Sequence, residues 1–415
     1  MCLCPTAWCS QECCYGHSSV VGHRTCMRRP CVAGGRNGTR NEQRDTCILA
    51  QELDGYSLVL LPLAILLLNN SHASAVQTLA GDTISMPLWV HPRERQLLDL
   101  KVGDMQVDMV VSQDGSGHFS TVSEALEAAR PVRGKMYVIY IKGGIYREEV
   151  VIRKNNIALI GDGINKTVIT GNKSRQGDGW ASYDTAVVYA KGKMLLARDL
   201  TVENTAGREA GAAVALRSAS KHSVFYRCEF KGYEDTLLAD SNRQFYRECV
   251  ISGTVDFIYG NAKAVFQDCL LLARAPLKGK YNVITAQGRD GPDGSSGFSF
   301  QNCSVTSQEY LNGPETETYL GRPWKNHSHV VFMQSFLDTI VHPSGWVAWN
   351  KTDGDVPPTV LYGEYGNTGP GANLSKRVPW LNVMDAGQAE HYTVKRFIRG
   401  DEWLNATGVV YQPGL

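Results

Sequence analysis

The stretch FYRCEFKGYEDTLLADSNRQFYRECVISGTVDFIYGNAKAVFQDCL, residues 225–270, repeats a short pattern at a nearly constant interval. An aromatic residue stands three positions before a cysteine in each repeat, and a further copy follows downstream. The four cysteines are Cys228, Cys249, Cys269 and Cys303, with spacings of 21, 20 and 34 residues. A period of 20–21 residues suits one coil of a parallel β-helix. Chance similarity among four short motifs is the alternative.

The sequence before this stretch also consists of short segments typical of β-strands. Short β-branched runs such as MYVIYIKGG (136–144) and TVITGN (167–172) are separated by Gly, Asn and Asp, and no long helix follows any of them. This spacing excludes a doubly wound α/β sheet. Residues 121–129 have helical periodicity. We therefore expect an all-β solenoid, a parallel β-helix with short flanking helices, and we assign the long cysteine spacing to one inserted loop at 288–297.

The repeat brings two carboxylates into register. Asp235 lies seven residues after Cys228, and Asp256 lies seven after Cys249. On adjacent coils they would be about 4.8 Å apart. Two carboxylates this close titrate at separate pH values, which supplies a proton donor and a nucleophile from one residue type. Pro276 is expected at this place on the next coil. A calcium site and a hydrogen-bonded pair of turn aspartates remain open as alternatives.

Composition narrows the class of protein. The chain has 415 residues, 43% of them hydrophobic, and its 42 basic residues nearly balance 41 acidic ones. A general nucleic-acid binder would show a basic excess, so we expect no nucleic-acid partner. Nine Asn-x-Ser/Thr sequons predict a secreted glycoprotein.

Residues 1–104 are predicted to be an atypical extension before a catalytic domain at 105–415. Eight of the twelve cysteines lie within the first 47 residues. They lack the paired C-x2-C spacing of structural zinc, so we expect no metal. The apolar segment 57–68 precedes Ala73-Ser74-Ala75. It is either a signal-peptide core or an apolar helix of a pro-region.

Five motifs together resemble the plant pectin methylesterases, or pectinesterases. They are GGIYREEV (143–150), ARDLTVENTAG (197–207), GYEDTL (232–237), GTVDFIYGNAKAVFQ (253–267) and YLGRPW (319–324). The resemblance runs from about Met105 to Leu415. It implies a right-handed parallel β-helix and hydrolysis of galacturonate methyl esters in pectin, without a cofactor. It also implies a monomer secreted to the plant cell wall (the apoplast), with a proteinaceous inhibitor as a partner.

The resemblance assigns roles to four residues. Asp256 would be the nucleophile, and Asp235 would protonate the methanol leaving group and then activate water. Arg322 would hold Asp256 ionised, and Trp324 would stack on the substrate. Residues 85–104 look like the linker after the family's inhibitor-like pro-region, with the usual dibasic processing site altered.

Several positions depart from the family's pattern. Ala212 and Glu234 stand where the family places glutamines that donate hydrogen bonds to the reacting ester, Glu234 at the oxyanion position. Loss of one such donor costs about 10²–10³ in rate. We therefore predict weak activity or an acid-shifted optimum, and keep a catalytically impaired pectin-binding relative as the alternative. Val187 and Tyr259 replace the usual Thr and Phe, which are milder changes.

Two further expectations concern the cysteines and the reaction class. Cys269 and Cys303 flank the predicted insertion and are candidates for a disulfide, whereas Cys228 and Cys249 are expected to be small core residues. Retaining glycosidases also hold two carboxylates about 5 Å apart, so a glycoside hydrolase is a third candidate.

Overall fold

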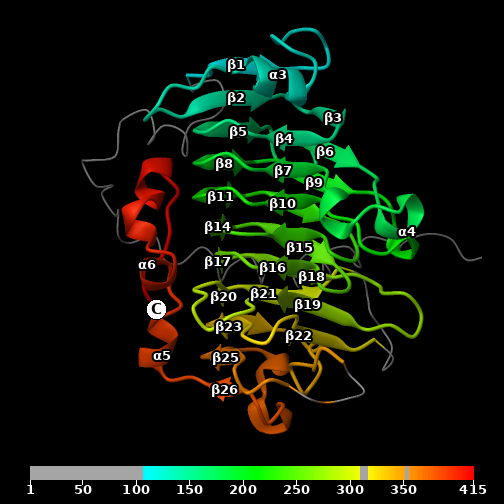
Figure 1. The fold of residues 1–415 in the computed structure, drawn as a ribbon, viewed down its shortest axis with the longest axis vertical. Coiled ribbons are helices and arrows are strands. Elements are labelled where there is room, and N and C mark those ends of the chain that lie inside the picture. Colours follow the sequence, from blue (N-terminus) through cyan, green and yellow to red (C-terminus); the bar gives the residue numbers. More distant parts are fainter. Residues whose placement is uncertain (1–105, 309–315, 351–353, 355) are drawn as a thin grey trace, which may run out of the picture. The chain divides into compact units, whose positions relative to one another are not determined.

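The computed structural model describes residues 106–308, 316–350, 354 and 356–415. Their strands form three parallel sheets, which the chain visits in turn so that three strands complete one coil (Figure 1). The predicted parallel β-helix is confirmed. The expectations for residues 1–104, including the cysteine-rich start, the apolar segment and the linker, lie outside the described residues. No helix in the described part of the chain is long and apolar enough to cross a membrane.

The three sheets contain eleven, seven and eight strands. The eleven-stranded sheet comprises β1 Met109–Val111, β2 Tyr137–Ile141, β5 Ile157–Gly161, β8 Leu195–Arg198, β11 Ser223–Tyr226, β14 Arg243–Arg247, β17 Lys263–Gln267, β20 Gly297–Gln301, β23 His329–Met333, β25 Leu361–Tyr365 and β26 Asn382–Val383. The seven-stranded sheet comprises β4 Val150–Ile152, β7 Val188–Ala190, β10 Leu216–Ser218, β13 Leu237–Ala239, β16 Ile258–Gly260, β19 Asn282–Gln287 and β22 Thr318–Pro323. The eight-stranded sheet comprises β3 Gly144–Arg147, β6 Thr167–Gly171, β9 Thr201–Asn204, β12 Glu229–Lys231, β15 Val250–Gly253, β18 Leu270–Ala273, β21 Ser304–Ser307 and β24 Phe336–Leu337.

The helices are short and lie outside the coils. The helix predicted at 121–129 is α3, Val122–Ala128, capped by the Thr121 side chain, which accepts from the Glu124 N–H. The others are α4 Arg175–Asp178, α5 Ala386–Glu390 and α6 Val394–Phe397. The C-terminal segment with α5 and α6 runs beside the eleven-stranded sheet (Figure 1). Its apolar side chains, among them Val394 and Phe397, share a buried cluster with residues of that sheet.

Stacked aromatic rings inside the coils fix the register. Phe225, Tyr246, Phe266, Phe300 and Phe332 are paired partners on successive strands. Their ring centroids are 4.9, 4.5, 4.6 and 4.4 Å apart, with nearly parallel planes. Offset stacking at this spacing adds about 0.5–1.5 kcal/mol per pair to the area buried. The aromatic position of the repeat therefore faces the core and continues for one coil more than the cysteine pattern showed.

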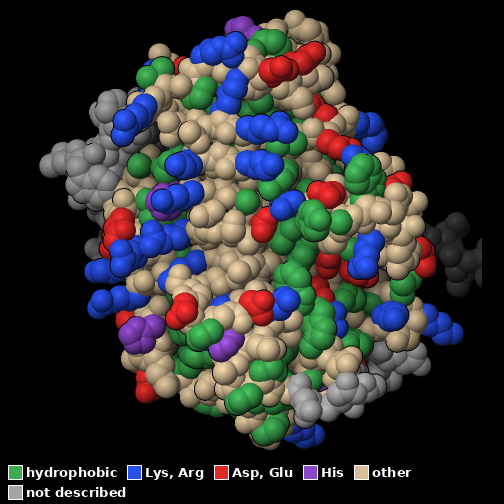
Figure 2. Space-filling model, viewed as in Figure 1, with side chains coloured by type: hydrophobic (Ala, Val, Ile, Leu, Met, Phe, Trp, Pro, Cys, Tyr) green, Lys and Arg blue, Asp and Glu red, His purple; other side chains and the backbone are tan. Residues whose placement is uncertain are grey.

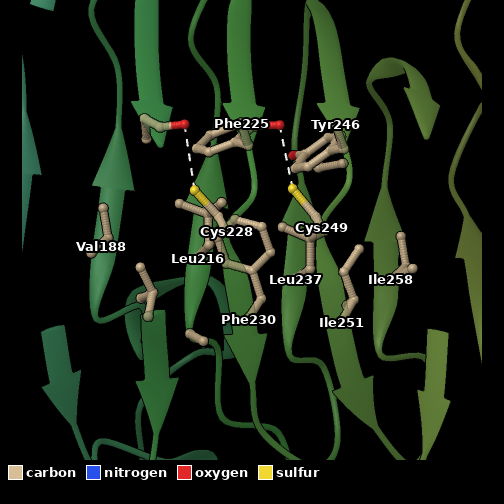
Figure 3. Packing of buried hydrophobic residues seen from close by; sticks show 14 of the residues in the cluster. Val188, Leu216, Phe225, Cys228, Phe230, Leu237, Tyr246, Cys249, Ile251 and Ile258 are labelled. Atoms are coloured by element: carbon tan, nitrogen blue, oxygen red, sulfur yellow. Dashed lines mark hydrogen bonds between the residues drawn. The ribbon is translucent and has the colours of Figure 1, made fainter. Parts of the chain in front are cut away.

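The four cysteines of the repeat are free thiols buried in the core. The Cys228 and Cys249 thiols donate to the Ala197 and Phe225 carbonyls of the preceding coil (Figure 3). Cys269 and Cys303 do the same toward Tyr246 and Phe266. The expected Cys269–Cys303 disulfide is therefore wrong in this structure. Each thiol donates to a backbone carbonyl of the coil before it.

The insertion before Cys303 is divided between two loops. One spans 274–281, between β18 and β19, and the other spans 288–296, between β19 and β20. The prediction of a single loop at 288–297 is therefore only half right. Because of the first loop, the residue that follows Asp256 in the register is Val283 and not Pro276. Ile258 pairs with Thr285, and Asp256 and Val283 each lie two residues before one of these partners.

Charge is unevenly distributed although the chain is almost neutral. Figure 2 shows Lys and Arg side chains gathered on one face of the coils. Lys193, Lys221, Arg243 and Lys263 follow one another on successive coils near the start of β8, β11, β14 and β17. Burial is the main cause that lowers the pKa of Lys263, and the neighbouring cations Arg243, Arg399 and Arg289 lower it further.

Candidate active site

A cleft of about 640 Å³ opens beside the seven-stranded sheet and contains the predicted carboxylate pair. Asp235 and Asp256 each stand two residues before a strand, and these strands, β13 and β16, pair with Leu237 opposite Ile258. The two aspartates therefore occupy equivalent places on adjacent coils, as the cysteine spacing predicted. The cleft is lined by Arg175, Ser182, Tyr183, Arg217, Glu234, Asp235, Leu238, Asp240, Asp256, Tyr259, Gly260, Asn261, Ala286, Gly288, Asp290, Arg322, Trp324, Lys325 and Trp349.

Both aspartates have a left-handed backbone. Their φ angles are 63° at Asp235 and 52° at Asp256. Asp adopts this region more readily than most residues, but it still costs about 1 kcal/mol or more. Hydrogen bonds from the neighbouring coil hold the turns, with the Asp235 N–H donating to the Val255 carbonyl at 3.1 Å. Such strained positions cluster at functional sites.

Arg322 forms a two-point ion pair with Asp256. Its Nε donates to Oδ1 at 2.9 Å, and its second guanidinium nitrogen donates to Oδ2 at 2.6 Å. The guanidinium also lies 4.2 Å from the centre of the Trp349 ring. Burial raises the pKa of Asp256, which is only 7% exposed, and the charge and hydrogen bonds of Arg322 oppose that rise. Arg322 therefore favours the ionised form of Asp256.

Asp235 has the opposite environment. Burial, together with the charge of Asp256, raises the pKa of Asp235 to about 8, and a hydrogen bond from Ser182 only partly offsets this. The surroundings therefore favour the proton on Asp235, whereas Arg322 favours the ionised form of Asp256. A pair of carboxyls with such different surroundings is chemically suited to supply a proton donor and a nucleophile.

Glu234, the predicted oxyanion position, also lines the cleft. Burial, followed by the charge of Asp256, raises the pKa of Glu234, while Arg322, Arg175 and Lys280 lower it. A raised pKa increases the fraction of Glu234 that carries a proton and can donate. The sequence predicted this direction from the proximity of the two aspartates.

Apart from Arg322, the two predicted substrate-binding positions are Trp324 and Ala212, and they differ in solvent exposure. Trp324 lines the cleft with 39% of its surface exposed, so a flat face is available to a ligand. Ala212 is 2% exposed and is not among the residues that line the cleft. Its carbonyl accepts from the N–H of Arg175, which does line the cleft. The assignment of Ala212 as a substrate-binding position stays a prediction.

Sequence reasoning missed Arg175, Ser182, Arg217 and Trp349. Ser182 donates to Asp235 Oδ2 at 2.6 Å, although it lies 53 residues earlier in the chain. It belongs to a short 3₁₀ turn, Ser182–Asp184, between β6 and β7. This turn does not belong to the aromatic–cysteine repeat, so no counting of coils could place it.

The sequence is similar to those of known proteins. A sequence model described as Pectinesterase matches residues 108–401. "Pectinesterase/pectinesterase inhibitor PPE8B" from Prunus persica is 47% identical over 354 residues, which cover 83% of this chain and 66% of that protein. "Pectinesterase 2" from Citrus sinensis is 46% identical over 335 residues, covering 79% and 64%. The chain thus spans slightly less than two thirds of these relatives' length.

Solved structures agree with the sequence comparison. The pectin methylesterase from carrot is 44% identical with a TM-score of 0.72, covering 75% of this chain and 98% of that one. A pectin methylesterase from Aspergillus niger is 28% identical with a TM-score of 0.62, covering 71% and 95%. The family match covers more than half of the sequence, including both aspartates, Arg322 and Trp324. The chain therefore belongs to the pectinesterase family.

Proposed function

We propose that this protein hydrolyses the methyl esters of galacturonate in pectin, releasing methanol and leaving pectate. The observation that carries the proposal is the forked Arg322–Asp256 ion pair beside the buried Asp235, whose pKa is raised to about 8, in an open cleft. The names of the relatives support the reaction class. A pectin methylesterase solved with a bound hexasaccharide, 25% identical and with a TM-score of 0.62, supports an oligosaccharide substrate.

In the first half of the reaction, an ionised oxygen of Asp256 attacks the ester carbonyl carbon. Electrons move to the carbonyl oxygen and form a tetrahedral oxyanion. When that oxyanion collapses, the bond to the methoxy oxygen breaks, and Asp235 gives its proton to the departing methoxide. Methanol leaves, an anhydride joins Asp256 to galacturonate, and Asp235 is ionised.

In the second half, Asp235 removes a proton from water while the water oxygen attacks the galacturonate carbonyl carbon. The bond to Asp256 then breaks, and Asp256 leaves as a carboxylate held by Arg322. Asp235 is protonated again, and the product is galacturonic acid, which loses its remaining acidic proton to solvent. The raised pKa of Asp235 suits both of its roles.

Glu234 is proposed to face the oxyanion. In its protonated form it donates a hydrogen bond there, and in its ionised form it repels the developing charge. Because its pKa is raised, the protonated fraction is larger than for an ordinary glutamate. Activity should therefore be shifted toward acidic pH.

The second candidate is a catalytically impaired relative that binds pectin. The observation that favours it is the burial of Ala212, whose side chain supplies no donor to the cleft. The two candidates differ in turnover and share the binding surface around Trp324.

We also propose that the protein is a secreted monomer of the plant cell wall and that a proteinaceous inhibitor binds it. Supporting secretion, six sequon asparagines in the described part of the chain are exposed: Asn165, Asn172, Asn302, Asn326, Asn350 and Asn373. The printed name of the Prunus persica relative joins an inhibitor to the esterase.

The reaction class is tested by measuring two products in one digest of highly methylated pectin. The proposal predicts methanol without a parallel gain of reducing ends. A gain of reducing ends would identify a glycoside hydrolase. A folded protein that retains pectin but releases neither product would identify the impaired relative.

A further inference from the structure

Three polar side chains form a row in the wall of the cleft. The Ser182 hydroxyl lies 2.6 Å from Asp235 Oδ2 and 2.7 Å from the Tyr259 hydroxyl. Tyr259 belongs to β16 and is 7% exposed, whereas Ser182 comes from the 3₁₀ turn that precedes β7. Two separate segments thus converge on one oxygen of Asp235.

The direction of donation in this row follows from the number of protons. Tyr259 is almost buried, and its hydroxyl has no other hydrogen-bond partner in the described part of the chain. It therefore satisfies its O–H by donating to Ser182. Ser182 has a single proton, which is left for Asp235 Oδ2. A carboxyl oxygen that accepts in this way leaves the acidic proton to the other oxygen, Oδ1.

The turn that carries Ser182 is held at two points. The Thr185 hydroxyl donates to the Ser182 carbonyl at 2.6 Å and accepts from the Val214 N–H at 2.9 Å. Arg217 on β10 donates to the Tyr183 carbonyl at 3.2 Å and is paired with Asp240 at 2.8 Å. The Ser182 hydroxyl is therefore positioned by the coil that lies next to Asp235.

We propose that Ser182 and Tyr259 are positioning residues that bind Asp235 Oδ2, reserve Oδ1 for the transferred proton, and stabilise the Asp235 carboxylate formed as methanol leaves. This inference rests on the proposed esterase reaction. Neither hydroxyl contacts the reacting atoms in this scheme. Ser182 acts on Asp235 directly, and Tyr259 acts only through Ser182.

The consequence for acidity has a definite sign. A hydrogen bond to the ionised carboxyl favours that form and is stronger than one to the neutral form. The Ser182 contact accordingly lowers the pKa of Asp235, against burial and the charges of Asp256 and Glu234, while Arg322 also lowers it. Without Ser182, Asp235 keeps its proton to higher pH and is a weaker acid toward the leaving group.

The test compares full-length wild type with Ser182→Ala, Ser182→Thr and Tyr259→Phe, and with the Ala/Phe double variant. Methanol release gives kcat and KM from pH 5 to 10, after subtraction of the enzyme-free blank. For Ser182→Ala we expect kcat to fall about tenfold, KM to stay unchanged, and the alkaline limb to move up by about one pH unit. Ser182→Thr should restore wild-type behaviour because it keeps the hydroxyl.

Tyr259→Phe should give a smaller shift in the same direction. The double variant should match Ser182→Ala, since Tyr259 has no separate route to Asp235. An unchanged alkaline limb in Ser182→Ala would overturn the proposal, as would fully additive effects of the two changes.

A second readout does not depend on turnover. Carboxyl carbon NMR of ¹³C-aspartate-labelled protein, with Asp235→Asn for assignment, reports the titration of Asp235 directly. We expect the titration of Asp235 to move to higher pH in Ser182→Ala. An unmoved titration would overturn the proposed role of Ser182. If wild type releases no methanol but the titration of Asp235 still moves in Ser182→Ala, the esterase proposal fails, whereas the effect of Ser182 on Asp235 is supported.

Discussion

Arg322 is the residue on which the charge of Asp256 depends. It donates two hydrogen bonds to the two oxygens of that carboxylate. A lysine keeps the positive charge but cannot reproduce the parallel pair of donors. Arg322→Lys should therefore raise the pKa of Asp256, move the acidic limb of kcat/KM upward and lower the rate by roughly 10–100-fold.

The measurement is kcat/KM for methanol release as a function of pH. Arg153→Lys is the matched control, because Arg153 is exposed and does not line the cleft. An acidic limb that stays in place in Arg322→Lys would show that Arg322 does not govern Asp256.

Glu234 is the position at which a substitution should raise the rate of methanol release. Ionised Glu234 repels the oxyanion, whereas a glutamine there donates an N–H at every pH. We expect Glu234→Gln to raise kcat near pH 7 by about tenfold, which is less than the 10²–10³ that one whole donor supplies, because the protonated fraction of Glu234 already donates. The gain should shrink toward acidic pH, where Glu234 is itself protonated.

Methanol release at pH 5 and 7 checks this prediction. Glu209→Gln, at an exposed residue away from the cleft, is the control. Equal rates for wild type and Glu234→Gln at both pH values would contradict the assigned role of Glu234.

Among the structural elements, the turn before Asp256 depends on Gly253. A Cβ added there would lie 2.3 Å from the Phe257 Cβ and 2.6 Å from the Tyr233 carbonyl oxygen. Relief requires a backbone shift, so Gly253→Ala should cost about 1–3 kcal/mol in the free energy of unfolding. It should also displace Asp256 and lower methanol release.

Urea unfolding measures this cost. Gly291→Ala is the control, because a Cβ there meets nothing within 4 Å. Its free energy of unfolding should stay within about 0.5 kcal/mol of wild type. A Gly253→Ala protein as stable as this control would mean that the turn has room that the structure does not show.

The repeat explains what the sequence could predict at this level. Because the coils stack in register, residues at equal distances from the repeated cysteine lie next to each other. The positions of Asp235 and Asp256 after their cysteines were therefore enough to place the pair. Side chains outside the repeat obey no such rule. Ser182 reaches Asp235 from a turn that has no counterpart in the cysteine-bearing coils.

The errors have equally specific causes. Counting assigned Pro276 to the third coil because the loop at 274–281 carries no Gly-rich signal, unlike the loop at 288–296. The cysteine pattern ended one coil early because Ser335 takes the cysteine's place. Its hydroxyl donates to the Phe300 and Met333 carbonyls, just as Cys303 donates to Phe266 and Gln301.

For the whole molecule, the buried acid Asp235 should reduce stability as pH rises. Its pKa is raised from 3.8 to about 8 by folding. Between these values the unfolded chain releases the proton while the folded protein retains it. This group's contribution to stability is complete below pH 4 and is lost progressively up to about pH 8. Asp235→Asn removes that loss.

Urea unfolding of wild type and Asp235→Asn at pH 5 and 8 measures the effect. We expect the variant to be the more stable protein at pH 8, with the difference between the two proteins smaller at pH 5. Exposed Asp293→Asn serves as the control. A difference independent of pH would contradict the raised pKa.

The most direct test of the proposed function is methanol release from highly methylated pectin between pH 4 and 8, by the full chain and its Asp256→Asn variant. Thermal unfolding of both proteins first establishes that each is folded. We predict release by wild type, strongest at the acidic end, and loss of that release in the variant. Equal release by both proteins would contradict Asp256 as the nucleophile, and no release by folded wild type at any pH would contradict the esterase itself.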